Sequence, residues 1–292
     1  MLELAHDDSP PAARLSRRDL FAGGGGLLAS ALMAPGLAHA SPPPTGAGPQ
    51  DAWLQDPQRR YENFLRTTGD LSGRISPQWW RGVYLGVVPG GQPRILFRLE
   101  GCEMKRLYRR SATECDVEYR LFTSFNDPDT NEPLSGKSWL NPYTQKQVVV
   151  EPNIGSADTT IRLTDRGITE TSRKGGFEGV IHLDWAAQES KVLMAGSKDR
   201  PESTPAPTGE YASHWLDRNA ARDFAAPRLD MQFTSTFIMF FRKFLDMAPG
   251  SGLTIWHASG FKATSVETLP EAYLRELRKH RPELREWLQE KA

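Results

Sequence analysis

The stretch Val117-Glu118-Tyr119-Arg120-Leu121-Phe122-Thr123-Ser124-Phe125-Asn126-Asp127-Pro128-Asp129 decides the fold class of this chain. Val117, Tyr119, Leu121 and Thr123 recur at every second position, which is the period of a β-strand with one buried face. The Asn-Asp-Pro-Asp run that follows is a strong turn signal. The stretch therefore predicts a strand that ends in a turn.

Similar period-two runs lie on both sides of this stretch. Before it, Trp80, Val83 and Leu85 mark one strand region, and Ile95, Phe97 and Leu99 mark one face of the next. Further strands are predicted at 145–151, 158–164, 166–172, 178–186, 190–195, 231–239 and 253–262. Many short alternating strands separated by turn residues predict a mainly β fold, an antiparallel β-barrel or strongly curved sheet.

Short helices are predicted at both ends of the β-rich region. Residues 51–65 have apolar positions at helical spacing, and the C-terminal region carries a capping box of Thr268 and Glu271. Pro282 is expected to break the C-terminal helix. Between the strands, 196–209 is predicted to be a loop and 210–224 to contain a helical turn. Residues 51–292 are thus predicted to form a single domain.

The first forty residues read as an export signal. The pair Arg17-Arg18 is typical of a twin-arginine signal, and Ala38-His39-Ala40 gives the small-x-small pattern of a cleavage site. We expect a signal peptide over 1–40 and a disordered leader over 41–50. The chain is expected to pass through the twin-arginine translocase and to become a periplasmic or secreted protein without stable membrane insertion.

Charge and cysteine content narrow the class of protein further. The chain has 36 Lys and Arg against 36 Asp and Glu, so its formal net charge is 0. This balance argues against a nucleic-acid partner, which needs a basic surface. The two cysteines, Cys102 and Cys115, lie on neighbouring predicted strands. They could form a disulfide in an oxidising periplasm or remain free thiols.

Two motifs resemble a known family. Ser138-Trp139-Leu140-Asn141-Pro142-Tyr143-Thr144, followed by the valine-rich run 148–150, is one, and Leu253-Thr254-Ile255-Trp256-His257-Ala258-Ser259-Gly260 is the other. Together they resemble the exported bacterial and fungal family catalogued as domain of unknown function 1838, over roughly residues 50–285. The chain departs from it where Glu151-Pro152-Asn153 follows the valine-rich run in place of a histidine. The resemblance implies export and domain extent but no activity.

Three side chains are candidates for acid–base catalysis. His182 and Asp184 are two apart on a predicted strand and share a face, so the carboxylate could orient the imidazole or raise its pKa. His257 lies in the second family-like motif beside small residues, which would permit close approach of a ligand. The alternative interpretation is an exposed polar pair and a structural histidine.

A second set of residues is predicted to bind a ligand. The large rings Trp139, Tyr143 and Trp256 belong to an aromatic-rich interior, and His214 follows the predicted loop. Phosphate-binding glycine loops and closely spaced metal-ligand motifs are missing from the sequence, so no cofactor and no metal ligand are predicted.

These observations favour an exported β-barrel that binds a small apolar or aromatic molecule, with acid–base chemistry of an isomerase, lyase or hydrolase type. Two alternatives remain open. One is a non-catalytic module that binds a ligand or an envelope partner through a surface aromatic patch. The other is a metalloprotein loaded before export.

Overall fold

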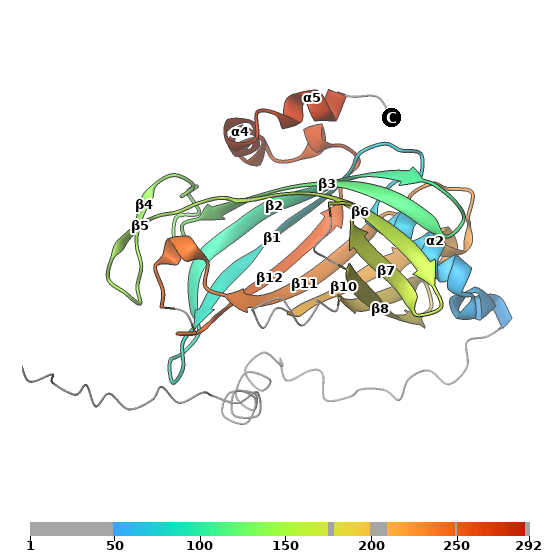
Figure 1. Cartoon of the computed structure of the whole chain (residues 1–292), viewed down its shortest axis with the longest axis horizontal. Helices are drawn as coiled ribbons and strands as arrows, with labels where there is room; N and C mark the ends of the chain where they lie inside the picture. Colours follow the sequence, from blue (N-terminus) through green and yellow to red (C-terminus); the bar gives the residue numbers. More distant parts are fainter. Residues whose placement is uncertain (1–48, 175–177, 199–208, 249, 290–292) are drawn as a thin grey trace, which may run out of the picture. The chain divides into compact units, whose positions relative to one another are not determined.

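The computed structural model describes residues 49–174, 178–198, 209–248 and 250–289. Ten antiparallel strands close into a barrel in the order β1-β12-β11-β10-β9-β8-β7-β6-β3-β2 (Figure 1). The strands are β1 (Ser76–Val87), β2 (Arg94–Arg109), β3 (Glu114–Asn126), β6 (Asn153–Thr164), β7 (Gly167–Ser172), β8 (Glu178–Ala187), β9 (Lys191–Lys198), β10 (Gly209–Asp217), β11 (Met231–Phe240) and β12 (Leu253–Lys262). The predicted barrel is confirmed. The predicted signal peptide, its cleavage site and most of the leader lie outside the described residues.

Two local predictions along these strands need correction. The helical turn predicted within 210–224 is confirmed as α3 (Arg218–Arg222), but the residues before it form strand β10, whose outward residues alternate with the inward Ala212, His214 and Leu216. Ile95 was placed on the face of Phe97, but the β1–β2 register shifts between Tyr84 and Leu85. This bulge turns Ile95 outward, where it is 51% exposed.

One end of the barrel is filled by helix α2 (Pro57–Thr68), which follows the short helix η1 (Pro49–Gln55). The side chain of Asp56 caps α2 by accepting from the backbone N–H groups of Gln58 and Arg59. Every residue from Asn63 to Thr68 is buried, which requires protein contact all around this half of the helix. Its apolar side chains pack on inward-facing residues of β2, β3, β6, β7 and β9.

The buried ammonium of Lys262 fastens α2 to the barrel. Lys262 Nζ donates to the carbonyls of Arg66 at 2.7 Å, of Thr67 at 3.2 Å and of Gly69. These carbonyls belong to the C-terminal end of the helix, where backbone acceptors lack intrahelical partners and a cation is favoured. Strand β12 therefore carries the group that completes α2.

The opposite end is covered by the β4–β5 hairpin (Ser138–Leu140 and Gln147–Val149) and the short helix η2 (Lys243–Leu245). Buried Asn141 holds them together, since its Nδ2 donates to the Leu245 carbonyl at 2.6 Å and its Oδ1 accepts from the Tyr143 N–H at 2.9 Å. Tyr143 OH donates to the Gly86 carbonyl at 2.7 Å. A Cβ on Gly86 would lie 2.7 Å from the Tyr143 ring, so glycine is required there.

The C-terminal helices α4 (Glu271–His280) and α5 (Leu284–Gln289) lie over the outer face of β2 and β3 (Figure 1). Tyr273 OH donates to the Phe122 carbonyl at 3.0 Å. The predicted break near Pro282 is confirmed, but the predicted capping box is wrong. Thr268 belongs to the short helix η3 (Val266–Thr268) and donates to the Ser265 carbonyl, while Pro270 precedes α4 without a side-chain cap.

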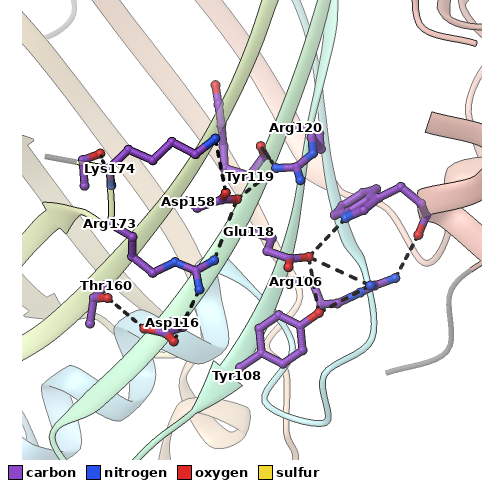
Figure 2. Close-up of polar contacts among 12 residues, drawn as sticks. Arg106, Tyr108, Asp116, Glu118, Tyr119, Arg120, Asp158, Thr160, Arg173 and Lys174 are labelled. Carbon is purple, nitrogen blue, oxygen red and sulfur yellow. Dashed lines mark hydrogen bonds and ion pairs between the residues drawn. The ribbon is translucent and has the colours of Figure 1, made fainter. Parts of the chain in front are cut away.

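Figure 2 shows the polar network on the outer face of β2, β3 and β6. Asp158 lies within 3.3 Å of Arg120 and 3.8 Å of Arg173. Glu118 accepts from the Trp287 indole at 3.1 Å and so binds α5 to β3. Each charged group here contacts an opposite charge or a hydrogen-bonding partner, which indicates a structural role in attaching the C-terminal helices.

The two cysteines do not pair. Cys102 lies opposite Phe122 under α4 on the outer face, whereas Cys115 lies opposite Arg109 and packs inside against α2. Both are free buried thiols. Their strands are neighbours, as expected, but opposite parity and distant register positions separate the sulfurs. Among the described helices, none combines the length and apolar character needed to cross a membrane.

Replacement of Lys262 by Met is predicted to lower the free energy of unfolding by about 2–4 kcal/mol, because the Gly69 carbonyl loses its donor and the carbonyls of Arg66 and Thr67 each lose one of two. Urea unfolding followed by circular dichroism measures the change. Lys279→Met, on the exposed side of α4, serves as the control and is expected to change stability by less than about 0.5 kcal/mol. Equal stability of the two variants would contradict the anchoring role.

Candidate functional site

Paired residues on neighbouring strands point to the same face, so the register shows which side chains enter the barrel. Buried Tyr84 pairs with Phe97 and with Trp256, and these three are therefore inward. Counting in steps of two residues from these positions, and following the pairing from strand to strand, identifies the inward-facing residues of every barrel strand. The inward side chains of β9, β10, β11, β12 and β1 include three adjacent rows that run across these strands.

The middle row consists of small residues on five neighbouring strands. In strand order they are Gly196, Ala212, Ser235, Ala258 and Gly82, each paired with the next. All except Ala258 keep partly exposed surface although they face inward. The two glycines are closely approached by neighbours, since a Cβ would lie 2.6 Å from Leu183 Cδ2 at Gly196 and 2.1 Å from the His257 carbonyl at Gly82.

Large side chains flank this row on both sides. The row two residues away in one direction contains Glu210, Phe237 and Trp256; the row in the other direction contains His214, Phe233 and Trp80. Four residues of extended strand separate the two rows, so their Cα atoms are about 13 Å apart. We call the floor of small residues and its two walls the interior cradle.

The second wall is built from stacked rings. Phe233 lies between His214, stacked at a centroid distance of 5.9 Å, and Trp80, edge-on at 6.4 Å. Trp80 also contacts Trp256 of the first wall, at 6.2 Å. The indole of Trp80 lies flat on Gly101 of β2, where a Cβ would come within 2.7 Å of its Nε1. Glycine at 101 therefore sets the position of this wall.

Two nitrogen atoms of this wall have no hydrogen-bond partner among the described residues: Trp80 Nε1 and His214 Nδ1. Trp80 is only 8% exposed. Buried polar atoms in folded proteins almost always have a partner, either protein, water or ligand. The wall thus contains two buried nitrogens whose hydrogen-bonding capacity the described residues leave unused.

Charged side chains of other strands also point into the barrel. Lys105 forms an ion pair with Glu103 on β2, and Lys198 of β9 forms one with Glu170 of β7. Each of these four side chains is 19–22% exposed. Isolated charges inside a protein are costly, and even paired ones are often less stable than apolar replacements. We therefore consider charged side chains at inward positions to be candidates for a functional role.

Electrostatic interactions connect these pairs with one another. Burial opposes the charged form of Lys105, but Glu103, Glu170 and Glu210 together raise its pKa. Burial likewise disfavours the ionised form of Glu170. The charges of Lys198 and Lys105 outweigh this effect and hold the pKa of that carboxyl below its usual value. We call Glu103, Lys105, Glu170, Lys198 and Glu210 the interior charged cluster. The ionised groups of this cluster lie at one side of the cradle.

His214 is neutral at physiological pH. Burial lowers its pKa to about 4, and the nearby cations Lys105 and Lys262 act in the same direction. A neutral imidazole is both a donor and an acceptor, so His214 is suited to hydrogen-bond a ligand or to accept a proton from it.

The structure brings together only part of the site predicted from sequence. His214 and Trp256, two of the predicted ligand-binding residues, both lie in the cradle. Trp139 and Tyr143 lie in the hairpin end cap, where Trp139 packs on Phe97 at 4.6 Å.

The three residues predicted to be catalytic lie on the outer surface of the barrel. His182 and Asp184 are exposed on the outside of β8. His257 is exposed on the outside of β12, four strands away in the barrel order, with its Nδ1 2.9 Å from Thr236 Oγ1. No cluster of three His, Cys, Asp or Glu within the described ranges is arranged to hold a metal ion.

The interior charged cluster was missed by the sequence prediction. Glu103 and Lys105 have the parity of Phe97 and Leu99, so counting in twos along β2 would have placed them inside. Glu210 could not be found this way, because its segment was not predicted to be a strand.

Comparison with known proteins finds one family model that matches part of this chain. Residues 74–155, from β1 into β6, match the family model described as protein of unknown function (DUF1838). The resemblance seen in the first sequence motif is thereby confirmed, and the second motif lies outside the matched residues. No curated protein matches the chain. A solved structure, Rv2717c from M. tuberculosis, is similar at 11% identity with a TM-score of 0.27, over 63% of this chain and 89% of that chain.

His214 makes stability depend on pH. Its pKa is about 4 in the folded state against 6.5 as the reference, so the unfolded chain binds the proton first as the pH falls. Between pH 6.5 and 4 the folded state should therefore lose stability through this residue, by about 2 kcal/mol at pH 5. Urea unfolding at pH 7 and pH 5 measures the loss in the wild-type protein and in His214→Gln. A loss of the same size in both proteins would show that His214 does not contribute.

Proposed function

We propose that this protein binds a small molecule inside its barrel, with the apolar or aromatic part of the molecule in the interior cradle. The observation that carries the proposal is the row of five small inward residues between two walls of large side chains. Small side chains at Ala212, Ser235 and Ala258 keep this floor free of bulky groups, and rings on both sides provide apolar contact.

The polar groups support the same site. The cradle holds an unpartnered indole N–H and a neutral imidazole, and the interior charged cluster lies beside it. Ligand sites typically combine mostly apolar walls with a few polar groups that orient the ligand. His214 is the one histidine of the described barrel strands that faces the interior, which makes it our candidate for acid–base chemistry on a bound molecule.

The alternative of a surface aromatic patch made by Trp139 and Tyr143 has less support. Tyr143 donates its hydroxyl to the Gly86 carbonyl at 2.7 Å, and Trp139 is held against Phe97. Both rings stabilise the end cap of the barrel. A surface patch that binds a partner needs aromatic rings that are not already engaged in contacts within the protein.

Filling the cradle tests the proposal. Ala212→Phe places a ring on the floor and is predicted to weaken binding of the neutral probe 1-naphthylmethanol at least about tenfold, because ring and probe need the same space. Isothermal titration calorimetry measures binding, and circular dichroism checks that the variant folds. Ser213→Phe, one residue away on the outer face of β10, is the matched control. Probe binding that is equal in both variants, or absent from the wild type, would overturn the proposal.

His182→Ala and His257→Ala complete this set of variants. Both side chains lie on the outer surface, so neither substitution is expected to change probe binding. If either reduced binding while Ala212→Phe did not, the site would lie on the outer face of the barrel.

We also propose that the protein is exported through the twin-arginine translocase and matures at Ser41. The support is the pair Arg17-Arg18 and the Ala38-His39-Ala40 pattern. Replacing both Arg17 and Arg18 by Lys is predicted to leave full-length precursor in the cytoplasm, as measured by cell fractionation and intact mass. Arg14→Lys is the control, and periplasmic product from the double variant would contradict the proposal.

A further inference from the structure

We propose that the outer face of β3 and β6 is a docking surface for an acidic peptide segment of a partner protein. The residues that would bind it are Arg110, Arg120, Arg173 and Lys174, which we call the outer basic cluster; Figure 2 labels the last three. The cluster lies on the outside of the barrel. The inference therefore goes beyond the proposed function and does not depend on the interior cradle.

The first of two carboxylates within the outer basic cluster is that of Asp116. Its Oδ2 lies 2.8 Å from Arg110 Nη2 and 3.7 Å from Arg173 Nη1. Its Oδ1 accepts from the Thr160 hydroxyl at 2.8 Å. Asp116 is thus already bound by one arginine and one hydroxyl, and Arg173 adds a second, longer ion pair.

The second carboxylate, that of Asp158, is shared by three cations. It lies 3.3 Å from Arg120, 3.8 Å from Arg173 and 3.9 Å from Lys174 (Figure 2). The four cations of the cluster therefore surround two carboxylates, which leaves an excess of two positive charges among these six described side chains. Like charges at such short range repel one another, and an anionic partner relieves the repulsion.

Neighbouring acidic residues do not remove this excess. Each has an arginine of its own: Glu114 pairs with Arg162, Glu118 with Arg106 and Glu283 with Arg281. Glu283 also interacts electrostatically with Arg120, but its ion pair with Arg281 already compensates its charge. The excess thus belongs to the cluster as the described residues form it.

Two members of the cluster keep hydrogen-bond donors that the described residues do not use. The guanidinium of Arg173 makes two long ion pairs and no hydrogen bond to any residue in the described ranges. Lys174 is 84% exposed, and its Nζ reaches Asp158 only at 3.9 Å. Exposed ion pairs of this kind contribute little to stability. Arginine and lysine donors at such a surface are well suited to carboxylates, which arginine can bind with two parallel hydrogen bonds.

The spacing within the cluster fits an extended peptide. Asp158 pairs in register with Glu118, and Asp116 lies two residues earlier on β3. The cationic groups therefore gather around two points about 7 Å apart along the strands. Side chains on the same side of an extended peptide are also about 7 Å apart. A segment with acidic residues at alternate positions would thus present its carboxylates at matching intervals.

The C-terminal helices favour a narrow chain over a flat membrane. Helices α4 and α5 stand above β2 and β3 (Figure 1), and the Trp287 indole of α5 donates to Glu118 at the border of the cluster. A helix with its side chains is about 10 Å thick. A bilayer would rest on this ridge and stay away from the strands beside it, whereas an extended peptide can lie along its foot.

Two fluorescein-labelled peptides test the inference. One has glutamates at alternate positions with serines between them, and the other has glutamines in their place. Fluorescence anisotropy with the full chain at pH 7 and low ionic strength is expected to show at least about tenfold tighter binding of the glutamate peptide, and added salt should weaken it. This comparison needs no variant. Equal binding of the two peptides, or no binding of either, would overturn the proposal.

A double variant tests the position of the surface. Replacing both Arg173 and Lys174 by Gln removes two cations that do not contact the helices, and it should abolish the preference for the glutamate peptide. Replacing both Arg278 and Lys279 by Gln removes the same dipeptide charges from the exposed side of α4 and should leave the preference unchanged. Circular dichroism checks that both variants fold. A preference that survives the first double variant, or is lost equally in both, would overturn the assignment to the outer basic cluster.

A last comparison separates the peptide from other anions and from the interior site. Vesicles with anionic phospholipid are expected not to sediment the wild-type chain; sedimentation that the Arg173 and Lys174 double variant abolishes, without binding of the glutamate peptide, would show a lipid surface and overturn the proposal. Ala212→Phe, which fills the cradle, should leave peptide binding unchanged. Loss of peptide binding in that variant would overturn the independence of the two sites, so failure of either proposal can be recognised separately.

Discussion

The number of strands sets the main physical constraint on this protein. Eight strands enclose an interior that side chains can just fill, and the diameter grows with strand number. A closed barrel of ten strands must therefore place something else inside: further chain, water or a ligand. Here further chain occupies both ends, as α2 on one side and the β4–β5 hairpin with η2 on the other. The middle section remains, and the partly exposed inward side chains lie there.

Fixing the two ends depends on a few buried polar contacts. Lys262 extends from β12 to the terminal carbonyls of α2, and Asn141 joins the hairpin to η2. Such contacts cost desolvation, but they are directional and so hold each end in one arrangement. The Trp-x-Asn-Pro-Tyr motif at residues 139–143 thus has a structural explanation in this chain. Its asparagine and tyrosine close the barrel, and the candidate site lies elsewhere.

The middle section combines features that would be unfavourable in a purely structural core. A core designed only for stability would use apolar side chains there, because buried ion pairs rarely outperform them. The chain instead places the five-membered charged cluster beside a floor of small residues. Perturbed ionisable groups in an enclosed space are typical of functional sites. The pKa shifts of Lys105 and Glu170 have the same origin, since each charge is stabilised by the others.

The family match and the candidate site lie largely on different strands of the barrel. The matched residues 74–155 supply β1, β2 and β3, with the hairpin end cap and one side of the charged cluster. Most of the cradle floor and walls come from β9 to β12, beyond the match. The wall nevertheless depends on the matched part, because Trp80 of β1 rests on Gly101 of β2.

The sequence by itself determined most of the strands, the helices at both ends and the break near Pro282, because period-two patterns, turn residues and proline act locally. It also predicted His214 and Trp256 as ligand-binding residues, and the strand register turns both toward the interior. It could not determine which histidines meet, since one residue of register decides whether a side chain faces in or out. His182 and His257 fell outside and His214 inside for that reason. Only the tertiary structure decided that Glu103, Lys105, Glu170, Lys198 and Glu210 share one interior, because closure of the barrel brings the four strands that carry them together across its width.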